Sequence, residues 1–190
     1  MSKGRLEAFS DGVIAIVITI MVLELKIPDG ADAAALRAAA PAFLMYTLSF
    51  IFLGIYWNNH HHMLHATTKI SGAVLWANLH LLFWLSIVPV VTAWMGRHYQ
   101  ASLPTAVYGV VLILCAAAYT VLVNCIIAVE GPHSKLARAI GRDVKGWISL
   151  VLYAIAIGVS FVSTVVADGL YVTVALIWLV PDRRIEKTLA

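Results

Sequence analysis

Apolar residues fill most of this chain in long runs, and charged residues gather in the short segments between the runs. A helix that crosses a membrane needs about 20 mostly apolar residues, and five runs are of about that length. A shorter sixth run follows near the end of the sequence. The predicted helices cover residues 5–27, 39–59, 71–95, 104–129, 146–166 and 169–181. The pattern therefore predicts an all-α membrane protein with six transmembrane helices, formed as a single domain over residues 1–190.

Turn-forming residues separate these runs. They occur at Pro28-Asp29-Gly30, in the polar cluster from Asn58 to His62, at Gly96-Arg97-His98, at Glu130-Gly131-Pro132 and at Asp168-Gly169. Because the last connection is so short, the fifth and sixth helices are expected to form a tight antiparallel hairpin with Asp168 as a turn residue.

The composition indicates a lipid environment rather than a water-soluble fold. Hydrophobic residues make up 62% of the sequence and charged residues only 12%, and the mean hydropathy is +0.90. A soluble domain carries roughly 25% charged residues, which cover its surface. Most of the surface of this chain is therefore expected to face lipid.

The distribution of positive charge predicts the orientation of the helices. Cytoplasmic loops hold an excess of Lys and Arg. If the N-terminus is cytoplasmic, the opposite side of the membrane holds only three of the 13 Lys and Arg residues, namely Lys26, Arg37 and Arg97. Both termini are therefore expected in the cytoplasm, with the chain in the inner cell membrane. No basic patch interleaved with stacking aromatics is present, so a nucleic-acid partner is not expected.

The longest predicted loop, residues 130–145, is basic and lies on the cytoplasmic side in this topology. We interpret it as a determinant of orientation. Contact with anionic lipid headgroups is the alternative, because each cationic side chain near such a surface contributes about 1 kcal/mol. Membrane lipid is thus an expected partner of the chain.

Asp11 is an ionisable residue near the beginning of the first predicted helix. A charge in a membrane helix costs a few kcal/mol unless it is paired or hydrated, so such a residue is a functional hypothesis. At about 100° per residue, Asp11 lies about 140° away from an apolar stripe that contains Phe9, Ile16, Ile20 and Leu23. The helix thus has a polar face for neighbouring helices. Its apolar stripe faces lipid, another helix or a central axis.

The segment around Asp11 also carries a familiar pattern. Arg5, followed by Phe9-Ser10-Asp11 and then by Gly12 and an Ile/Val-rich run, resembles the signature of the transmembrane-protein-175 family. This family comprises lysosomal potassium channels and their bacterial relatives. Further matches are Tyr56-Trp57-x-x-His60-His61-His62, Trp76-x-Asn78-Leu79, Pro89 and Pro181-Asp182-Arg183-Arg184. Six spans per chain match the bacterial branch.

The resemblance implies a homotetramer in which four copies of the first helix line one pore that conducts K⁺ in preference to Na⁺. No cofactor is implied beyond the permeant ion. Carried over from the family, the constriction falls on Ile16, and Thr19, Ile20 and Leu23 are further pore-facing positions. An apolar ring can close such a pore by dewetting. The predicted function is therefore a potassium-permeable channel with a hydrophobic gate.

The resemblance also implies a polar network that fixes the pore helix to its neighbours. On the first helix, its members are Arg5, Phe9, Ser10 and Asp11. The candidate partners on other helices are Trp57, Asn58, Asn78 and one or two of the clustered histidines His60, His61, His62 and His65, with His61 taken as the site residue. Direct coordination of an ion by Asp11 is the alternative, and its angular offset from the stripe disfavours it.

Selectivity is less readily explained by the sequence. The usual potassium filter is a Thr-Val-Gly-Tyr-Gly loop whose carbonyls replace the hydration shell of the ion, and the sequence contains none. Selectivity would then arise from the width of the pore and from a ring of Thr19 hydroxyls. The alternative is that the Thr19 hydroxyl bonds back to its own helix.

Two other functions are a membrane metalloenzyme and a secondary transporter. His61 and His65 are four residues apart and share a helical face, so they could bind a metal. A membrane-embedded His-ligated metalloenzyme needs several such pairs, however, and the other histidines outside the cluster stand alone. No metal site is therefore predicted, and the chain is not expected to be an enzyme. A secondary transporter would show broken helices and midplane charges in corresponding halves, and no such match is present.

Overall fold

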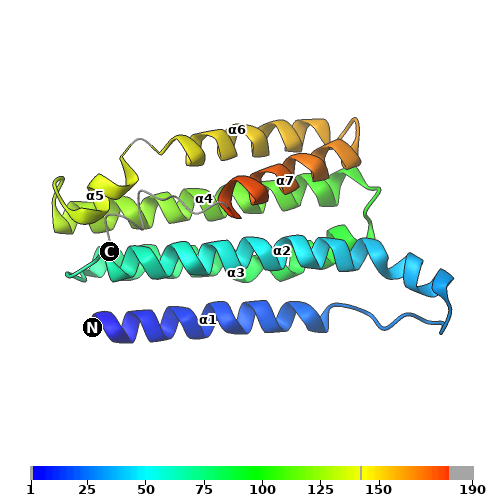
Figure 1. The fold of residues 1–190 in the computed structure, drawn as a ribbon, viewed down its shortest axis with the longest axis horizontal. Helices are drawn as coiled ribbons and strands as arrows, with labels where there is room; N and C mark the ends of the chain where they lie inside the picture. The colour runs from blue at the N-terminus through cyan, green and yellow to red at the C-terminus, as the bar shows by residue number, and fades with distance from the viewer. Residues whose placement is uncertain (1, 142, 180–190) are drawn as a thin grey trace.

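The computed structural model describes residues 2–141 and 143–179, which form a bundle of α-helices (Figure 1). In chain order the helices of this described part are α1 (Lys3–Leu23), α2 (Ala33–His65), α3 (Gly72–Arg97), α4 (Ser102–Glu130), α5 (Lys135–Ile140), α6 (Val144–Val159) and α7 (Thr164–Leu179). All but α5 run along the long axis of the bundle. The short α5 lies in the connection between α4 and α6. The all-α fold predicted from the sequence is confirmed.

Membrane-spanning length differs between the helices. Among the described residues, α1 to α4 are each long and apolar enough to cross a membrane. Helix α6 is apolar but has 16 residues. At 1.5 Å per residue it is about 24 Å long, which is shorter than a hydrocarbon core of about 30 Å. Helix α6 therefore needs local thinning of the bilayer or a neighbouring surface to complete its crossing. Helix α7 is also apolar, and its described part ends at Leu179.

Helix α2 is longer than predicted at both ends. At its start, the Asp32 side chain accepts a hydrogen bond from the Ala35 N–H at 2.8 Å and caps the helix. At its end, the helix continues through the polar residues 58–62, which the sequence pattern placed in a connection, and stops at His65. Polar side chains remain compatible with the helix here because they bond locally or to neighbouring helices. The Asn59 amide, for example, donates to the Ile55 carbonyl at 3.0 Å.

The hairpin between α6 and α7 also differs from the prediction. The chain turns at residues 160–163, where the Ser163 hydroxyl accepts from the Val166 N–H at 3.4 Å and begins α7. Asp168 therefore lies inside α7 and is not a turn residue. A serine can cap a helix as well as an Asp-Gly pair can form a turn, and the sequence pattern did not separate the two. The predicted end of the last helix at residues 180–181 and the segment Pro181–Arg184 lie outside the described residues.

The core runs between α3 and α4, which share the most extensive contact in the bundle. Hydrogen bonds between polar side chains join the helices within this core. The Ser49 hydroxyl of α2 bonds to the Tyr108 hydroxyl of α4 at 2.9 Å and accepts from Thr92 of α3 at 2.7 Å. The Tyr171 hydroxyl of α7 donates to the Thr105 carbonyl of α4 at 2.9 Å. Such interhelical bonds satisfy polar groups that have no water to bind in a membrane.

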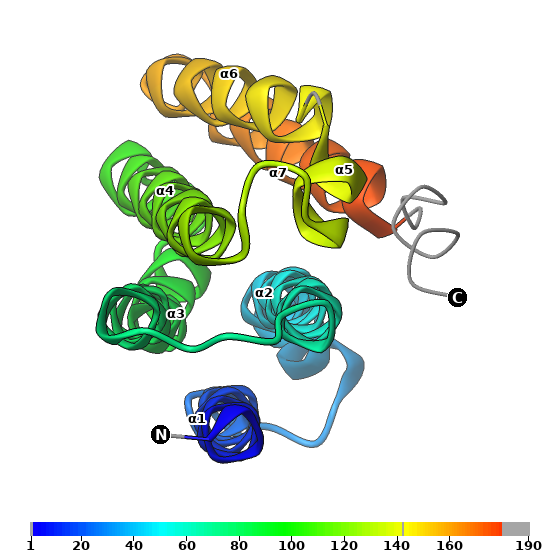
Figure 2. The same ribbon diagram turned by 90° about the vertical axis from the view of Figure 1, so that its left-hand side faces the viewer.

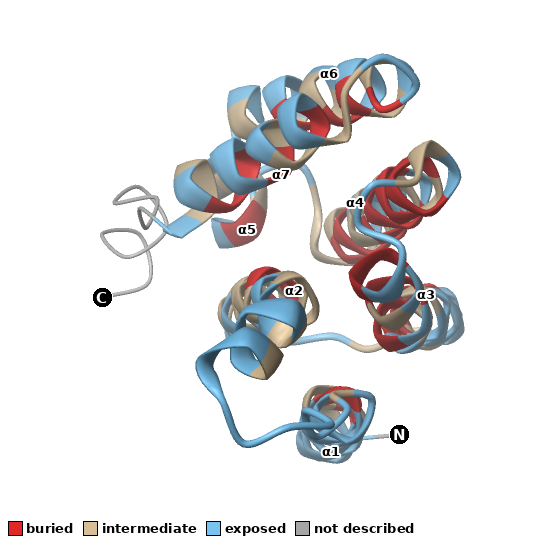
Figure 3. Ribbon diagram, turned by 90° about the vertical axis from the view of Figure 1, so that its right-hand side faces the viewer, coloured by how far each residue is buried: buried red, intermediate tan, exposed pale blue. Residues whose placement is uncertain are grey.

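Helix α1 lies at the edge of this bundle, packed against α2 and α3 (Figure 2). Its buried residues follow a helical spacing of three or four and are Leu6, Ser10, Ile14, Val17 and Met21. Viewed from the opposite end, most of the remaining surface of α1 is exposed (Figure 3). The fold therefore presents one long face of α1 outside its own subunit.

The position of Asp168 generates a prediction. Its Oδ1 atom is buried and has no hydrogen-bond partner among the residues that the structure describes. A buried carboxylate without a partner is costly, and an amide of the same shape removes the charge. We expect Asp168→Asn to raise the free energy of unfolding by about 1–2 kcal/mol, measured as a higher Tm in detergent. Asp29→Asn, in an exposed connection, is the control and should leave Tm unchanged. A lower Tm for Asp168→Asn would contradict this account.

Candidate functional site

The exposed face of α1 is an apolar stripe. Ile16 is 57% exposed, Ile20 46% and Leu23 80%, and Phe9 continues the same face toward the N-terminus. The structure therefore gives α1 one face against its own subunit and an apolar face outside it. From Phe9 to Leu23 the stripe extends about 21 Å, which is most of the thickness of a hydrocarbon core.

Thr19 interrupts the apolar character of this face. Its side chain is exposed, and its hydroxyl donates to the Ile16 carbonyl at 2.9 Å. This is a bond back to its own helix, the alternative to an outward-facing ring of Thr19 hydroxyls. The bond uses the hydroxyl hydrogen, so the oxygen lone pairs remain available as acceptors on the exposed face. Bonding to the helix and presenting an oxygen outward are therefore compatible.

A groove of about 320 Å³ lies beside the stripe, between α1 and α3. Ile16 and Ile20 form one wall, and Pro89 and Val90 of α3 form the other. The two pore-facing isoleucines expected from the sequence thus border an open apolar space rather than a packed contact.

A chain of buried hydrogen bonds fixes the opposite face of α1. The Asn78 amide nitrogen of α3 donates to the Ser10 hydroxyl of α1 at 2.9 Å, and the Asn78 amide oxygen lies 2.7 Å from the His60 Nε2 of α2. All three side chains are buried. Because an amide oxygen can only accept, His60 donates from Nε2. One continuous polar chain therefore joins α1, α3 and α2 inside the subunit.

A second contact joins α1 to α2 closer to the surface. The Trp57 indole Nε1 donates to Asp11 Oδ1 at 3.1 Å. The ring of His61 stacks on Trp57, with centroids 6.2 Å apart, and on His65 at the same distance. Asp11 thus contacts a neighbouring helix of its own subunit and lies away from the stripe.

The structure brings together only some of the residues expected in the polar network. Ser10, Asn78, Asp11 and Trp57 form the bonds just described. Of the clustered histidines, His60 holds the hydrogen-bonded position, whereas His61, the one taken as the site residue, stacks on Trp57. Within residues 2–141 and 143–179, Arg5 and Asn58 form no side-chain hydrogen bond or ion pair, and Phe9 is half exposed. The adjacent polar residues Asn58, Asn59, His60 and His61 of α2 point in four different directions. The sequence alone therefore did not identify His60 as the one that faces the interior.

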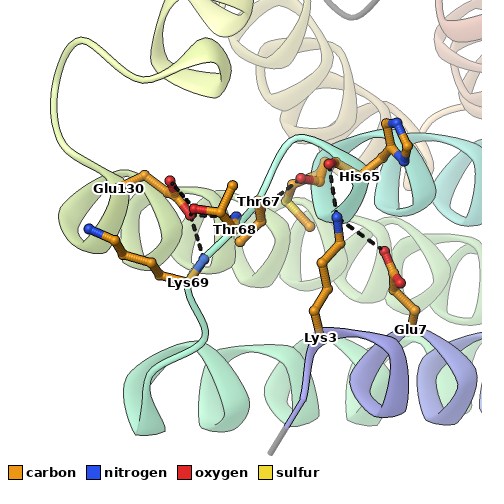
Figure 4. A network of polar contacts seen from close by, with 8 residues as sticks. Lys3, Glu7, His65, Thr67, Thr68, Lys69 and Glu130 are labelled. Atoms are coloured by element: carbon orange, nitrogen blue, oxygen red, sulfur yellow. Dashed lines mark hydrogen bonds and ion pairs between the residues drawn. The ribbon is translucent and has the colours of Figure 1, made fainter.

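Further contacts at the N-terminal end of α1 were not anticipated. Lys3 Nζ donates to the His65 carbonyl at 2.9 Å and lies 3.7 Å from a Glu7 carboxylate oxygen (Figure 4). Nearby, the Glu130 carboxylate accepts from the backbone N–H groups of Thr68 and Lys69 at 2.6 and 2.7 Å. These bonds fasten α1 to the last residue of α2, and α4 to the connection between α2 and α3. Partners on the backbone leave no residue pattern, which is why the sequence gave no signal for them.

At the other end of α1, a salt bridge closes the contact with α3. Arg97 Nη2 lies 2.9 Å from Glu24 Oε2. Both side chains are about half exposed, so the pair contributes at most about 1 kcal/mol. It lies just beyond Leu23, where the apolar stripe ends.

The histidine cluster does not assemble a metal site in the part of the chain that the structure describes. No group of three or more His, Cys, Asp or Glu side chains lies close enough there to hold a metal ion. The described residues therefore offer no set of ligands for the metal of a metalloenzyme.

Comparison with known proteins supplies the family. The family model described as endosomal/lysosomal potassium channel TMEM175 matches residues 5–89, which contain α1, α2 and most of α3. A protein named potassium channel from Chryseobacterium sp. (strain P1-3) is 56% identical over 189 residues, covering 100% of this chain and 98% of that protein. This chain belongs to the TMEM175 family. The resemblance stated from the sequence is confirmed, and membership in a channel family means that the chain is not an enzyme.

More distant TMEM175 relatives agree in sequence and in fold. A protein named potassium channel from Streptomyces collinus is 31% identical over 88% of each chain. The crystal structure of a lysosomal potassium-selective channel TMEM175 homolog from Chamaesiphon minutus matches this structure with a TM-score of 0.84 and 27% identity. That match covers 95% of this chain and 97% of the other. The apolar helices and the family together make this TMEM175 member a multi-pass membrane protein.

The buried polar chain generates a prediction. Replacing Asn78 by alanine leaves the Ser10 hydroxyl and the His60 ring without their partner, and each unsatisfied buried group costs about 1–3 kcal/mol. We expect Asn78→Ala to lower Tm in detergent. Unfolding is monitored as the loss of the helical circular dichroism signal on heating. Asn124→Ala, which removes an exposed asparagine from α4, is the matched control and should change stability by less than about 0.5 kcal/mol. Equal effects of the two substitutions would contradict an anchoring role for Asn78.

Proposed function

We propose that the chain forms a potassium-permeable cation channel of the cell (inner) membrane, with a pore lined by α1 of four symmetric copies. Residues 1–190 act as one channel domain in this proposal. The observation that carries it is the exposed apolar stripe Ile16, Ile20 and Leu23, on a helix whose other face is anchored by buried hydrogen bonds. The names of the bacterial relatives, which call them potassium channels, support K⁺ as the permeant ion.

The geometry of α1 favours a pore axis over lipid as the partner of the stripe. A single exposed stripe cannot enclose a pore, but symmetric copies around an axis can, and closed cyclic symmetry is the usual arrangement of homo-oligomers. Helix α1 lies at the edge of the subunit, so copies can meet along it without rearrangement. The number four comes from the family resemblance. The groove beside Ile16 offers space for an apolar side chain of the neighbouring copy.

The gate in this proposal is a ring of four Ile16 side chains. An apolar constriction excludes water and blocks ions by dewetting, without a charged plug. Ile20 and Leu23 extend the apolar pore toward the far side of the membrane. Conduction requires the ring to widen, and the Trp57 to Asp11 bond and the Ser10 chain keep α1 from rotating while it does so. No cofactor takes part in this mechanism.

A polar substitution at the gate tests the pore. Ile16→Asn keeps a similar length but hydrates the constriction, so we expect K⁺ flux through liposomes to rise at least tenfold and K⁺ over Na⁺ discrimination to weaken. Flux is measured with a K⁺-sensitive dye under a set membrane potential. Val22→Asn is the control, because Val22 is exposed on α1 but lies about 120° from the stripe, and its flux should remain at the wild-type level.

Two outcomes of this experiment would contradict the proposal. Unchanged flux for Ile16→Asn with active wild-type protein would remove the gate from α1. Flux that depends on a coupled gradient of Na⁺ or H⁺ would instead indicate the transporter alternative.

Selectivity is tested separately at Thr19. Thr19→Val keeps the shape of the side chain and removes the oxygen that faces outward beside the Ile16 carbonyl. We expect K⁺ over Na⁺ discrimination to fall severalfold with the K⁺ flux nearly retained, because only the acceptor ring is lost. The ratio is measured from reversal potentials in planar bilayers. A wild-type ratio in Thr19→Val would assign selectivity to the width of the pore alone.

A further inference from the structure

A cavity of about 400 Å³ lies between α2, α4 and α6, away from the α1 stripe. This volume falls in the range of about 300–1,000 Å³ that ligand sites occupy. Its wall contains six aromatic residues, namely Phe52, Tyr56, Tyr119, Trp147, Tyr153 and Trp178. Helix α2 ends, and α6 begins, at the end of the bundle that carries the N-terminus, so the cavity lies toward that end (Figure 1).

Several polar groups of the cavity wall are bonded within it, whereas the hydroxyls of Tyr56 and Tyr153 form no hydrogen bond with the residues that the structure describes. The Trp178 indole nitrogen donates to the Ser149 hydroxyl at 2.8 Å, and that hydroxyl donates to the Lys145 carbonyl at 2.8 Å. The Tyr119 hydroxyl donates to the Asn59 carbonyl at 3.4 Å. The bonded groups need no partner from an occupant, and most of the exposed wall is carbon surface. An apolar molecule fits this wall better than a polar one.

The rim of the cavity reaches the outer surface of the bundle. Trp147 is 71% exposed, and Ala117 and Thr120 of α4 are also exposed. In a membrane, the outer surface between parallel helices faces lipid, and tryptophan prefers the depth of the headgroups. The molecules available to this opening are therefore acyl chains, with their headgroups at the level of Trp147.

The charge beside the rim is positive. Lys145 Nζ lies 6.0 Å from the centroid of the Trp178 ring, at the wall of the cavity. Lys135 and Arg138 are exposed on α5, which comes just before α6 in the chain. Asp143 is the single acidic residue between 131 and 146, and one of its carboxylate oxygens caps α6 by accepting from the Gly146 N–H. An anionic headgroup complements this rim, because each nearby cation strengthens its binding about fivefold.

We propose that the cavity between α2, α4 and α6 binds an acyl chain of an anionic phospholipid, with the phosphate of that lipid beside Lys145. Helix α2 connects this site to the anchor of α1. Tyr56 and Asn59 face the cavity, and the adjacent residues Trp57 and His60 bond to Asp11 and Asn78. The lipid therefore supports the helix that holds α1 in place. This site does not depend on the proposed pore.

Tryptophan quenching by brominated lipids tests the site. The full chain is reconstituted in phosphatidylcholine vesicles that contain increasing fractions of phosphatidylglycerol or phosphatidylcholine with brominated acyl chains. We expect brominated phosphatidylglycerol to reach half-maximal quenching at a mole fraction at least fivefold lower than brominated phosphatidylcholine. The double substitution Trp147→Phe and Trp178→Phe should abolish this excess, because these two indoles line the cavity.

Two further variants locate the contact. Lys145→Gln should lower the preference for phosphatidylglycerol about fivefold, and Arg97→Gln, at the other end of the bundle, should leave it unchanged. Filling the cavity with Ala116→Leu and Ala117→Leu should abolish the excess, while Ala154→Leu, on an exposed position of α6, should not. Lys145→Gln changes the charge beside the cavity and not its shape. It therefore tests the contact with the lipid phosphate even if the filled variant does not fold.

Equal quenching by the two lipids in the wild-type protein would overturn the proposal. Excess quenching that persists in the double tryptophan variant or in the folded filled variant would also overturn it. Because fluorescence reports contact and not conduction, absence of K⁺ flux in the same vesicles would count against the pore and leave the lipid site intact. K⁺ flux without a preference for phosphatidylglycerol would count against the lipid site and leave the pore intact.

Discussion

The arrangement of this subunit depends on the buried hydrogen bonds that join Ser10, Asn78 and His60. Hydrocarbon offers no water to these groups, so they must pair with one another. Measured interhelical bonds in membranes contribute only about 0.6–2 kcal/mol each, and their main effect here is therefore on geometry. A rotation of α1 by one residue, about 100°, would put Phe9 or Asp11 in place of Ser10 and break the chain. The bonds thus select one rotational setting of α1, in which the apolar stripe faces away from the subunit.

Contacts at both ends of α1 support that setting. Lys3 fastens the N-terminal end to the last carbonyl of α2, and Glu24 pairs with Arg97 at the other end. Both contacts are exposed and weak, whereas the Ser10 chain is buried. In the middle of α1, Ile14 and Val17 are buried, while Ile16 and Ile20 border the groove beside α3. The helix is thus fixed in rotation near its beginning, and open space lies beside the proposed constriction.

Much of this architecture could be predicted from the sequence because lipid imposes simple rules. Long apolar runs must be helices, and a polar face on an apolar helix must pack against protein. This reasoning separated the Ser10 and Asp11 face of α1 from the Ile16 stripe, and the structure shows the same two faces. It was less successful where polar residues end a run. His60 and His61 are neighbours of the same type, and only the position of Asn78 on α3 determines which of them is buried. Likewise, Ser163 begins α7, so that Asp168 lies inside a helix instead of a turn.

Helix α2 links the proposed lipid site to the anchor of α1 because its two faces serve different partners. One face gives Trp57 and His60 to the anchor of α1, and the other gives Tyr56 and Asn59 to the aromatic cavity. Successive residues on a helix differ by about 100° in direction, which lets adjacent residues face different partners. If α2 moved toward the cavity as a rigid body, the anchor residues would move with it. A substitution or a ligand that fills the cavity could therefore alter the hydrogen bonds that anchor α1 without contacting the apolar stripe. An effect of lipid on conduction, in such a bundle, requires no contact between the lipid and the permeating ion.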